Sequence, residues 1–354
     1  MNTSTFQRPV ALGRIDYMNV APIYYGIDNG LVAQGINPGI SQEIRLISGP
    51  PNTLNQMMID GSLDISPVSS AAYARNAREW LILPDLAIAC HKRVLSVLLV
   101  SRYSLEALTG KRILITDESS SARDLCRLIF SLKGVQPEFV VGKIKSPSQL
   151  PKGIDAALVI GDSALSQPWA RVFPIIYDLG TLWWNMTGLP FVFAIWAVRK
   201  DFARKYPERV ETVLALLKTS RKFGNENMKQ IVGKACTKLG IDVSTARLYY
   251  ESLVYELADR EKEGLELFYK GLYQAGITNH TAPLFFFGNA TPKTARQAPL
   301  AYADLPARSL SPKLQTGNNG LLSGGMRPLS CAMEKSVSTA RTPSVPISRE
   351  NSFT

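Results

Sequence analysis

The segment GSLDISPVSSAAYA, residues 61–74, decides the fold class because it joins a strand directly to a helix. Residues 63–68, LDISPV, are strand-like, and a helix begins at Ser69 immediately after them. A helix at 53–59 and a strand-like run at 44–48 precede the segment. Strands that alternate with helices in this way predict a parallel sheet covered by helices.

The same alternation occurs upstream and then a second time downstream. Residues 10–15 form a strand that leads into a helix near Pro22, where the missing proline N–H would be unbonded anyway. The second set contains a strand at 112–116, a helix at 121–133 with an apolar stripe, and a strand at 156–160. The sequence therefore predicts two α/β units.

Two α/β units joined by two crossing segments make a two-lobed, hinged fold. We expect the crossings near 101–105 and 189–191. The first lobe would then be discontinuous, built from residues 1–100 and 190–288. Residues 101–189 would form the second lobe.

The composition of the 354 residues fits a globular body with a tail. Hydrophobic residues make up 45% of the chain, which is ample for one or two cores. Residues 289–354 are rich in Pro, Ser, Thr and Gly without periodicity, which predicts a disordered tail. The net charge is +11, and part of it lies in this tail. A mildly basic body suits a small anionic substrate. The sequence has no basic stripe interleaved with aromatic residues, so we do not expect a nucleic-acid partner.

Cysteine usage and hydropathy indicate the compartment. None of the four cysteines forms a CxxC pair or a metal-type spacing, and Cys90 and Cys126 lie in apolar runs typical of buried free thiols. Residues 1–9 are polar, and no run approaches the roughly 20 apolar residues that span a bilayer. We therefore expect a cytoplasmic protein that does not bind a membrane.

Several local catalytic motifs are absent from the sequence. The two histidines, His91 and His280, lie in no HExxH or Cys/His cluster. No glycine-rich phosphate loop follows any predicted strand. The sequence therefore predicts no metal site and no cofactor.

Polar residues at the junctions between strands and helices are the remaining candidates. In an open α/β sheet, ligands bind outside the carboxyl ends of the strands, and helix N-termini there attract anions. Two serine-rich helix starts, one in each lobe, suit the two carboxylates of a small dianion. The residues that share this placement are Asn19, Ser69, Ser70, Ser119, Ser120, Ser121, Gly161 and Asp162.

Each candidate also has an ordinary structural interpretation. Serine is a common helix N-cap, which stabilises a helix by about 1 kcal/mol. Asn19 fits a turn, and Ser96, inside the apolar run 95–100, fits a core hydroxyl with its hydrogen bonds satisfied. Asp162 fits a helix cap, and Trp183 fits the core. The residues alone leave both interpretations open.

Six segments, spread over about residues 10–280, carry a resemblance to a known family. The run TGLPFVFAIW at 187–196 is the most specific of them, because so long and unusual a string does not arise by chance. On these segments the chain resembles the chorismate dehydratases of the futalosine route to menaquinone. The segments are GRIDYMNVAPIY (13–24), GSLDISPVSSAAYA (61–74), LPDLAIAC (83–90), VLSVLLVS (94–101), LVIGDSAL (158–165) and DLGTLWWNMTGLPFVFAIWAVRKDFA (178–203).

The resemblance implies a type II periplasmic-binding-protein-like fold with an interlobe cleft. It also implies loss of water from chorismate, a small dianionic substrate, to give 3-[(1-carboxyvinyl)oxy]benzoate. Asn19 matches the catalytic asparagine of the family and Ser96 its active-site serine. The positions matched to substrate binding are Ser69, Ser70, Ser119, Ser120, Ser121, Gly161, Asp162, Trp183 and Thr187.

One departure and two alternatives accompany the resemblance. Ala122 stands where the family often has a second hydroxyl, which affects how a carboxylate would be bound there. The sister branch releases a naphthoate from a cyclised futalosine and is thought to use a histidine, which the 101–190 lobe lacks. A solute-binding protein of the same fold, which binds without catalysis, is the other alternative.

Overall fold

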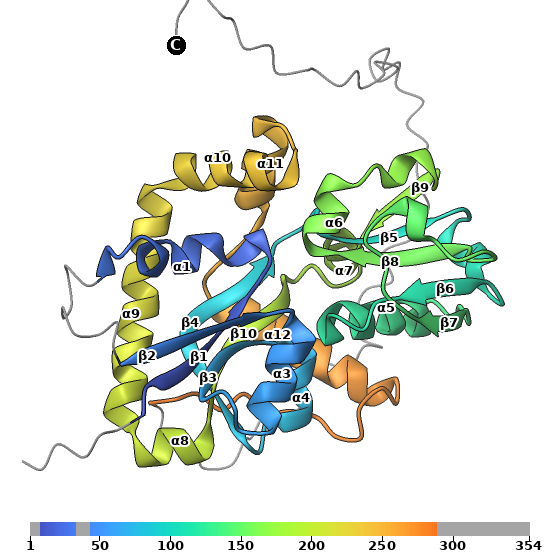
Figure 1. Cartoon of the computed structure of the whole chain (residues 1–354). Helices are drawn as coiled ribbons and strands as arrows, with labels where there is room; N and C mark the ends of the chain where they lie inside the picture. Colours follow the sequence, from blue (N-terminus) through green and yellow to red (C-terminus); the bar gives the residue numbers. More distant parts are fainter. Residues whose placement is uncertain (1–7, 33–42, 289–354) are drawn as a thin grey trace, which may run out of the picture. The chain divides into compact units, whose positions relative to one another are not determined.

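The computed structural model describes residues 8–32 and 43–288, and these contain two five-stranded sheets. The first sheet has the strand order β2-β1-β3-β10-β4 and the second has the order β7-β6-β8-β5-β9 (Figure 1). The predicted alternation of strands and helices is confirmed in both sheets. The predicted tail at 289–354 lies outside the described residues.

The first sheet is parallel except for one strand. β1 pairs in parallel with β2 and β3, whereas β10 runs antiparallel between β3 and β4. β10 is buried along nearly its whole length because β3 and β4 flank it and helices pack against its side chains. The strands are β1 Val10–Ile15, β2 Ile44–Gly49, β3 Ile65–Ser69, β4 Trp80–Cys90 and β10 Phe191–Arg199.

The second sheet repeats this plan. β6 is parallel to β7 and β8, and β5 runs antiparallel between β8 and β9. Each sheet thus contains one antiparallel strand, and that strand is the one that follows a crossing from the other sheet. The strands are β5 Val97–Ser101, β6 Arg112–Ile115, β7 Glu138–Val141, β8 Ala156–Ile160 and β9 Ile175–Asp178.

The first crossing lies earlier than the sequence predicted. β5 belongs to the second sheet, so the chain crosses between Cys90 and Val97 and not near 101–105. Residues 97–100 therefore belong to the second lobe, which corrects the boundary at residue 100. The return crossing runs from β9 through α7, Leu179–Thr187, to β10. The chain enters the first sheet between Thr187 and Phe191, where the crossing near 189–191 was expected.

Asp178 joins the two crossings. Its carboxylate accepts hydrogen bonds from Val94 N at 3.0 Å and Leu95 N at 2.7 Å, and from Thr181 N at 3.0 Å as the N-cap of α7. Leu95 has a φ of 61°, in the left-handed region that costs a leucine roughly 1–2 kcal/mol. The bond to Asp178 therefore offsets a strained backbone next to Ser96.

Short helices cover the strand ends of both sheets, and longer helices pack behind the first. Pro207 begins a new helix directly after α8, because proline is tolerated only in the first turn of a helix. The helices are α1 Ala21–Asp28, α3 Pro51–Ile59, α4 Ser70–Asn76, α5 Ser120–Leu132, α6 Gly161–Ser166, α8 Lys200–Lys205, α9 Pro207–Glu226, α10 Met228–Leu239, α11 Val243–Ser252 and α12 Asp259–Gln274, with single 3-10 turns η1 Met18–Val20, η3 Leu105–Leu108, η4 Pro147–Gln149 and η5 Trp169–Arg171.

A close contact between α1 and α9 fixes the turn that follows β1. A Cβ on Gly224 would lie 2.0 Å from the carbonyl oxygen of Pro22, so only glycine allows this approach. The N–H of Ile27 also donates to Ser220 Oγ at 3.1 Å. Helix α9 thereby holds α1, and with it the turn that contains Asn19, at the end of β1.

Helix α11 provides a prediction on pH and stability. Hydrogen bonds from Ser244 and Thr245 lower the pKa of the Asp242 N-cap from near 3.8 to about 2. A depressed carboxyl pKa stabilises the fold above the unfolded value and loses that effect as the pH falls through the folded value. Asp242→Asn should therefore lower the free energy of unfolding by about 1 kcal/mol or less near pH 6, because the cap is exposed.

The difference from wild type should shrink between about pH 4 and pH 2. Chemical denaturation across this range measures it. Glu211→Gln, on an exposed face of α9, is the control and should show no such trend. A difference for Asp242→Asn that stays constant down to pH 2 would contradict the assignment.

Candidate active site

A pocket lies between the two sheets and receives side chains from both. Its polar lining consists of neutral groups that stand at strand ends, on the turns that follow them, or on the first crossing. Its apolar lining comes from β1, β4, β5, β8 and β10, from the first residue of α3 and from the first crossing. The polar lining residues are Tyr17, Asn19, Ser69, Ser96, Ser119 and Gly161, and the apolar ones are Ile15, Pro51, Ile88, Val94, Val97, Ile160, Phe193 and Ala194.

Asn19 lies in the turn η1 that follows β1 and lines the pocket. Its Oδ1 is buried and has no hydrogen-bond partner among the described residues. Leaving a buried acceptor unpaired costs about 1–3 kcal/mol. A ligand that donates to this oxygen would recover that cost, so Asn19 is suited to binding and not only to a turn.

Ser96 lines the same pocket from the end of the first crossing. It is buried, and its carbonyl oxygen accepts a hydrogen bond from Gly161 N at 2.8 Å. The pKa of the neighbouring Tyr249, on α11, is raised by burial, and the Ser96 side chain opposes that rise. Ser96 is therefore fixed by its backbone and faces both the pocket and a buried phenol.

Ser69 and Ser119 reach the pocket from opposite lobes. Asn55 Oδ1 accepts a hydrogen bond from Ser69 N at 3.1 Å, and Asn55 Nδ2 donates to Ser69 Oγ at 3.3 Å. Ser119 is the N-cap of α5, and its Oγ accepts from Ala122 N at 3.3 Å. Ala122 itself is fully buried and outside the lining, so the hydroxyl that the chain lacks there would not face the pocket.

Three of the predicted serines lie outside the pocket lining. Ser70 and Ser121 are fully buried and share a hydrogen bond of 2.9 Å between their hydroxyls. Ser70 Oγ also donates to Val192 O, and Ser121 Oγ accepts from Ala71 N. This pair joins α4 of the first lobe to α5 of the second, and Ser120 is the buried first residue of α5.

Gly161 and Asp162 begin α6, but only Gly161 lines the pocket. Gly161 has a φ of 62°, and a Cβ there would lie 3.0 Å from the Tyr17 ring. Asp162 Oδ1 accepts from Met18 N at 3.0 Å, and its Oδ2 lies 3.3 Å from Lys238 Nζ. Both oxygens of Asp162 thus contact the first lobe, and the carboxylate acts as a link between lobes.

Trp183 and Thr187 do not reach the pocket. Trp183 is fully buried, packs edge-on against Phe191 and Phe268, and donates from Nε1 to Pro190 O at 3.1 Å. Thr187 ends α7, where its hydroxyl accepts from Leu189 N. The described contacts of these two residues are structural and neither lines this pocket, so their role in substrate binding stays a prediction.

Tyr17 is a lining residue that was not predicted from the sequence. Its hydroxyl donates to Glu118 Oε2 of the second lobe at 2.8 Å, and its ring covers Gly161. Burial, followed by the nearby Glu118, raises the pKa of Tyr17 well above its ordinary value. Its position two residues before Asn19, at the end of a strand, was the signal that could have identified it.

The pocket offers no ionised group at neutral pH. Tyr17 is the only titratable residue of its lining, and it stays protonated. His91 pairs with Glu261 at 2.6 Å and does not line the pocket.

Among residues 8–32 and 43–288, no three His, Cys, Asp or Glu side chains form a group that could hold a metal ion. No helix of that part is long and apolar enough to cross a bilayer.

Solved structures with the same arrangement confirm the fold. A protein from Archaeoglobus fulgidus superposes with a TM-score of 0.62 at 20% identity, over 76% of this chain and 98% of that one. The alkanesulfonate-binding protein of Xanthomonas axonopodis pv. citri superposes with a TM-score of 0.57 at 11% identity, over 78% and 96%. The predicted periplasmic-binding-protein-like fold is therefore confirmed.

Sequence comparison gives the family. A chorismate dehydratase of Thermus thermophilus is 28% identical over 79% of this chain and 99% of its own length. A chorismate dehydratase of Campylobacter jejuni is 24% identical over 73% and 95%. A 1,4-dihydroxy-6-naphthoate synthase of Thermus thermophilus is 28% identical over only 42% and 53%. A family described as menaquinone biosynthesis matches residues 10–274. The chain belongs to this menaquinone biosynthesis family.

Proposed function

We propose that this protein is a hydro-lyase that converts chorismate to 3-[(1-carboxyvinyl)oxy]benzoate and water. The observation that carries the proposal is the neutral pocket built around the unpaired Asn19 Oδ1, in a chain whose full-length relatives are chorismate dehydratases. The sister reaction is disfavoured because no histidine lines the pocket. The free thiols of Cys90, Cys126 and Cys236 suit a cytoplasmic location.

The reaction removes the C3 proton and the C4 hydroxyl of the chorismate ring, and the ring becomes aromatic. Aromatisation supplies a large driving force, so positioning can replace a strong protein base. We infer that the enolpyruvyl carboxylate of chorismate accepts the C3 proton, because the lining holds no group that titrates near pH 7. The C4–O bond breaks, and the leaving hydroxide takes this proton from the enolpyruvyl carboxyl, so that water is released and the carboxylate is regenerated.

Asn19 and Ser96 have separate roles in this proposal. The Asn19 amide orients the enolpyruvyl side chain or the departing hydroxyl. The Ser96 hydroxyl donates to the departing C4 oxygen. The serines at the two helix starts, Ser69 and Ser119, hold carboxylate groups from opposite lobes.

The size of the pocket implies that the lobes move during turnover. Its volume is ≈ 50 Å³, whereas pockets for small molecules usually have about 300–1,000 Å³. Tyr17–Glu118 and Met18–Asp162 are contacts that cross between the lobes next to the pocket. We infer that these contacts open to admit chorismate and close around it, which excludes water.

Incubation of the purified chain with chorismate tests the proposal. Mass spectrometry should show a product lighter by one water, with the ultraviolet spectrum of a substituted benzoate. Chorismate that binds but is recovered unchanged would establish a solute-binding protein. A chain that neither binds nor converts chorismate would refute both.

Ser96→Ala should lower kcat/KM for chorismate by about 10- to 100-fold, because one hydrogen bond to the leaving oxygen is lost. Steady-state kinetics measure the change. Ser101→Ala is the matched control, since Ser101 is a buried serine of the following strand β5 whose hydroxyl donates to Tyr103 O outside the pocket. Equal activity of Ser96→Ala and wild type would remove Ser96 from the mechanism.

A further inference from the structure

A second, larger cavity lies on the other side of the turn that carries Asn19. Its volume is ≈ 400 Å³, within the range typical of small-molecule sites. It lies between α10, α1 and the end of β1, and it shares only Ile15 and Tyr17 with the pocket described above. Because a chorismate site between the lobes leaves this cavity unused, it requires a separate explanation.

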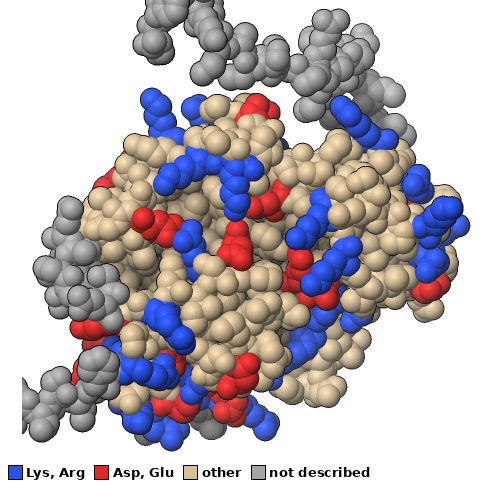
Figure 2. Space-filling view, viewed as in Figure 1, with Lys and Arg blue, Asp and Glu red and all other residues tan. Residues whose placement is uncertain are grey.

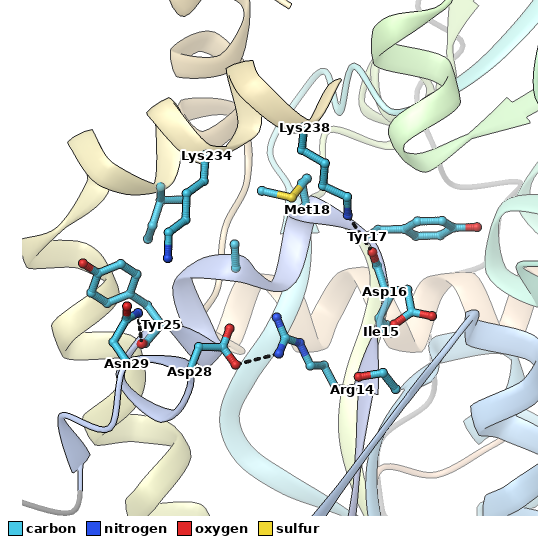
Figure 3. A pocket seen from close by; sticks show the side chains of 13 residues that line it. Arg14, Ile15, Asp16, Tyr17, Met18, Tyr25, Asp28, Asn29, Lys234 and Lys238 are labelled. Carbon is cyan, nitrogen blue, oxygen red and sulfur yellow. Dashed lines mark hydrogen bonds and ion pairs between the residues drawn. The ribbon is translucent and has the colours of Figure 1, made fainter. Parts of the chain in front are cut away.

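Three cationic side chains line this cavity. Lys234 and Lys238 lie four residues apart on α10 and therefore project from one face of the helix. Arg14 belongs to β1, on the opposite wall. Figure 3 shows the two lysines extending from the helix toward the wall that carries Arg14, Asp16 and Asp28. In Figure 2, basic side chains gather where α10 lies in Figure 1.

Of these three cations, Lys234 has no ion pair among the described residues, and Lys238 has only a half-exposed one. Arg14 is neutralised by Asp28 at 2.6 Å. Of the described carboxylates, none lies within 4.0 Å of Lys234 Nζ, which instead lies 5.6 Å from the centre of the Tyr25 ring. Lys238 Nζ donates to the Asp16 carbonyl at 3.2 Å and lies 3.3 Å from Asp162, a loose contact on a half-exposed side chain.

The two carboxylates of the lining, Asp28 and Asp16, do not cancel the charge of the two lysines. Burial raises the pKa of Asp28, while Arg14 and Lys234 oppose that rise. The remaining carboxylate of the lining, Asp16, is exposed, so water screens it. Two lysines thus face a cavity of metabolite size with Tyr25 as an apolar wall.

We propose that this cavity binds a metabolite-sized dianion that carries carboxylate or phosphate groups, held by Lys234 and Lys238 beside the Tyr25 ring. Two ammonium groups one helical turn apart match two negative charges. The Arg14–Asp28 pair forms the opposite wall and adds little net charge. This site is distinct from the interlobe pocket and does not depend on the activity proposed above.

Isothermal titration at constant ionic strength tests the proposal with two probes, inorganic phosphate and benzene-1,3-dicarboxylate. At least one probe should bind wild type, and the two arms show whether phosphate or carboxylate is preferred. The double variant K234A/K238A should bind that probe about tenfold more weakly or worse. Both lysines are exposed on α10, so the variant should stay folded, which its melting temperature checks.

Two controls locate the bound anion. K222A/K229A removes the same charge from exposed positions on α9 and α10 outside the cavity, and it should bind like wild type. Asn19→Ala alters only the interlobe pocket and should also bind like wild type. Three results would overturn the proposal: no binding at millimolar probe, equal weakening in K222A/K229A, or binding lost in Asn19→Ala but kept in K234A/K238A.

Discussion

Replacement of Asn19 by alanine is expected to lower kcat/KM for chorismate dehydration by about 100-fold or more, the largest effect on activity in this protein. Asn19 is the one lining residue with a buried oxygen that no described group satisfies. Its amide is therefore free to bind the substrate. Stability should be little changed or slightly higher, because the unpaired acceptor is removed with the side chain.

Two variants control this measurement. Asn19→Asp keeps the shape but places a carboxylate beside a dianion, so it should not restore activity. Asn225→Ala, at an exposed position on α9, should behave like wild type. Steady-state kinetics on folded protein measure all three. Asn19→Ala with wild-type kcat/KM would show that the asparagine belongs to the turn alone.

Asp178→Asn should produce the largest loss of stability, about 2–4 kcal/mol in the free energy of unfolding. Burial raises the pKa of Asp178, and the N–H groups of Thr181, Leu95 and Val94 oppose that rise. The amide would turn a donor toward N–H groups that need acceptors. The strained backbone at Leu95 would then lose its support, and Ser96 would move with it.

Activity should therefore fall together with stability in this variant. Urea denaturation and kinetics on the same preparation measure both. Asp259→Asn replaces a carboxylate that is 94% exposed and paired only with Lys262, so it should change neither. If Asp178→Asn unfolds at the same urea concentration as wild type, Asp178 does not brace the crossings.

Local sequence predicted the elements of the fold better than the path between its sheets. The helix start at Ser69 and the strand at Ala156–Ile160 follow from short-range patterns. The first crossing was placed too late because residues 95–100 are apolar apart from Ser96, so no turn residue marks it. Its position depends on Asp178, which is more than 80 residues away in sequence.

The site was predicted in the same uneven way. The expectation that strand-end polar groups meet placed Asn19, Ser69, Ser119 and Gly161 correctly in one lining. The same expectation could not tell which of several consecutive polar residues faces the pocket. Each helical residue points about 100° away from the previous one. Residues one or two positions further on thus point elsewhere: Ser70 and Ser121 into the contact between lobes, Asp162 toward Lys238.

The pH dependence of kcat/KM for chorismate, measured in wild type, Asp162→Asn and Tyr17→Phe, tests most directly whether the pocket works without a base of its own. If the substrate carboxylate takes the proton, all three enzymes should show one acidic limb at the same pH, set by chorismate itself, whatever the height of the plateau. Both replaced side chains bind across the lobes, so the plateau can fall in the variants. A limb that disappears in either variant would identify a protein group as the base and contradict the account.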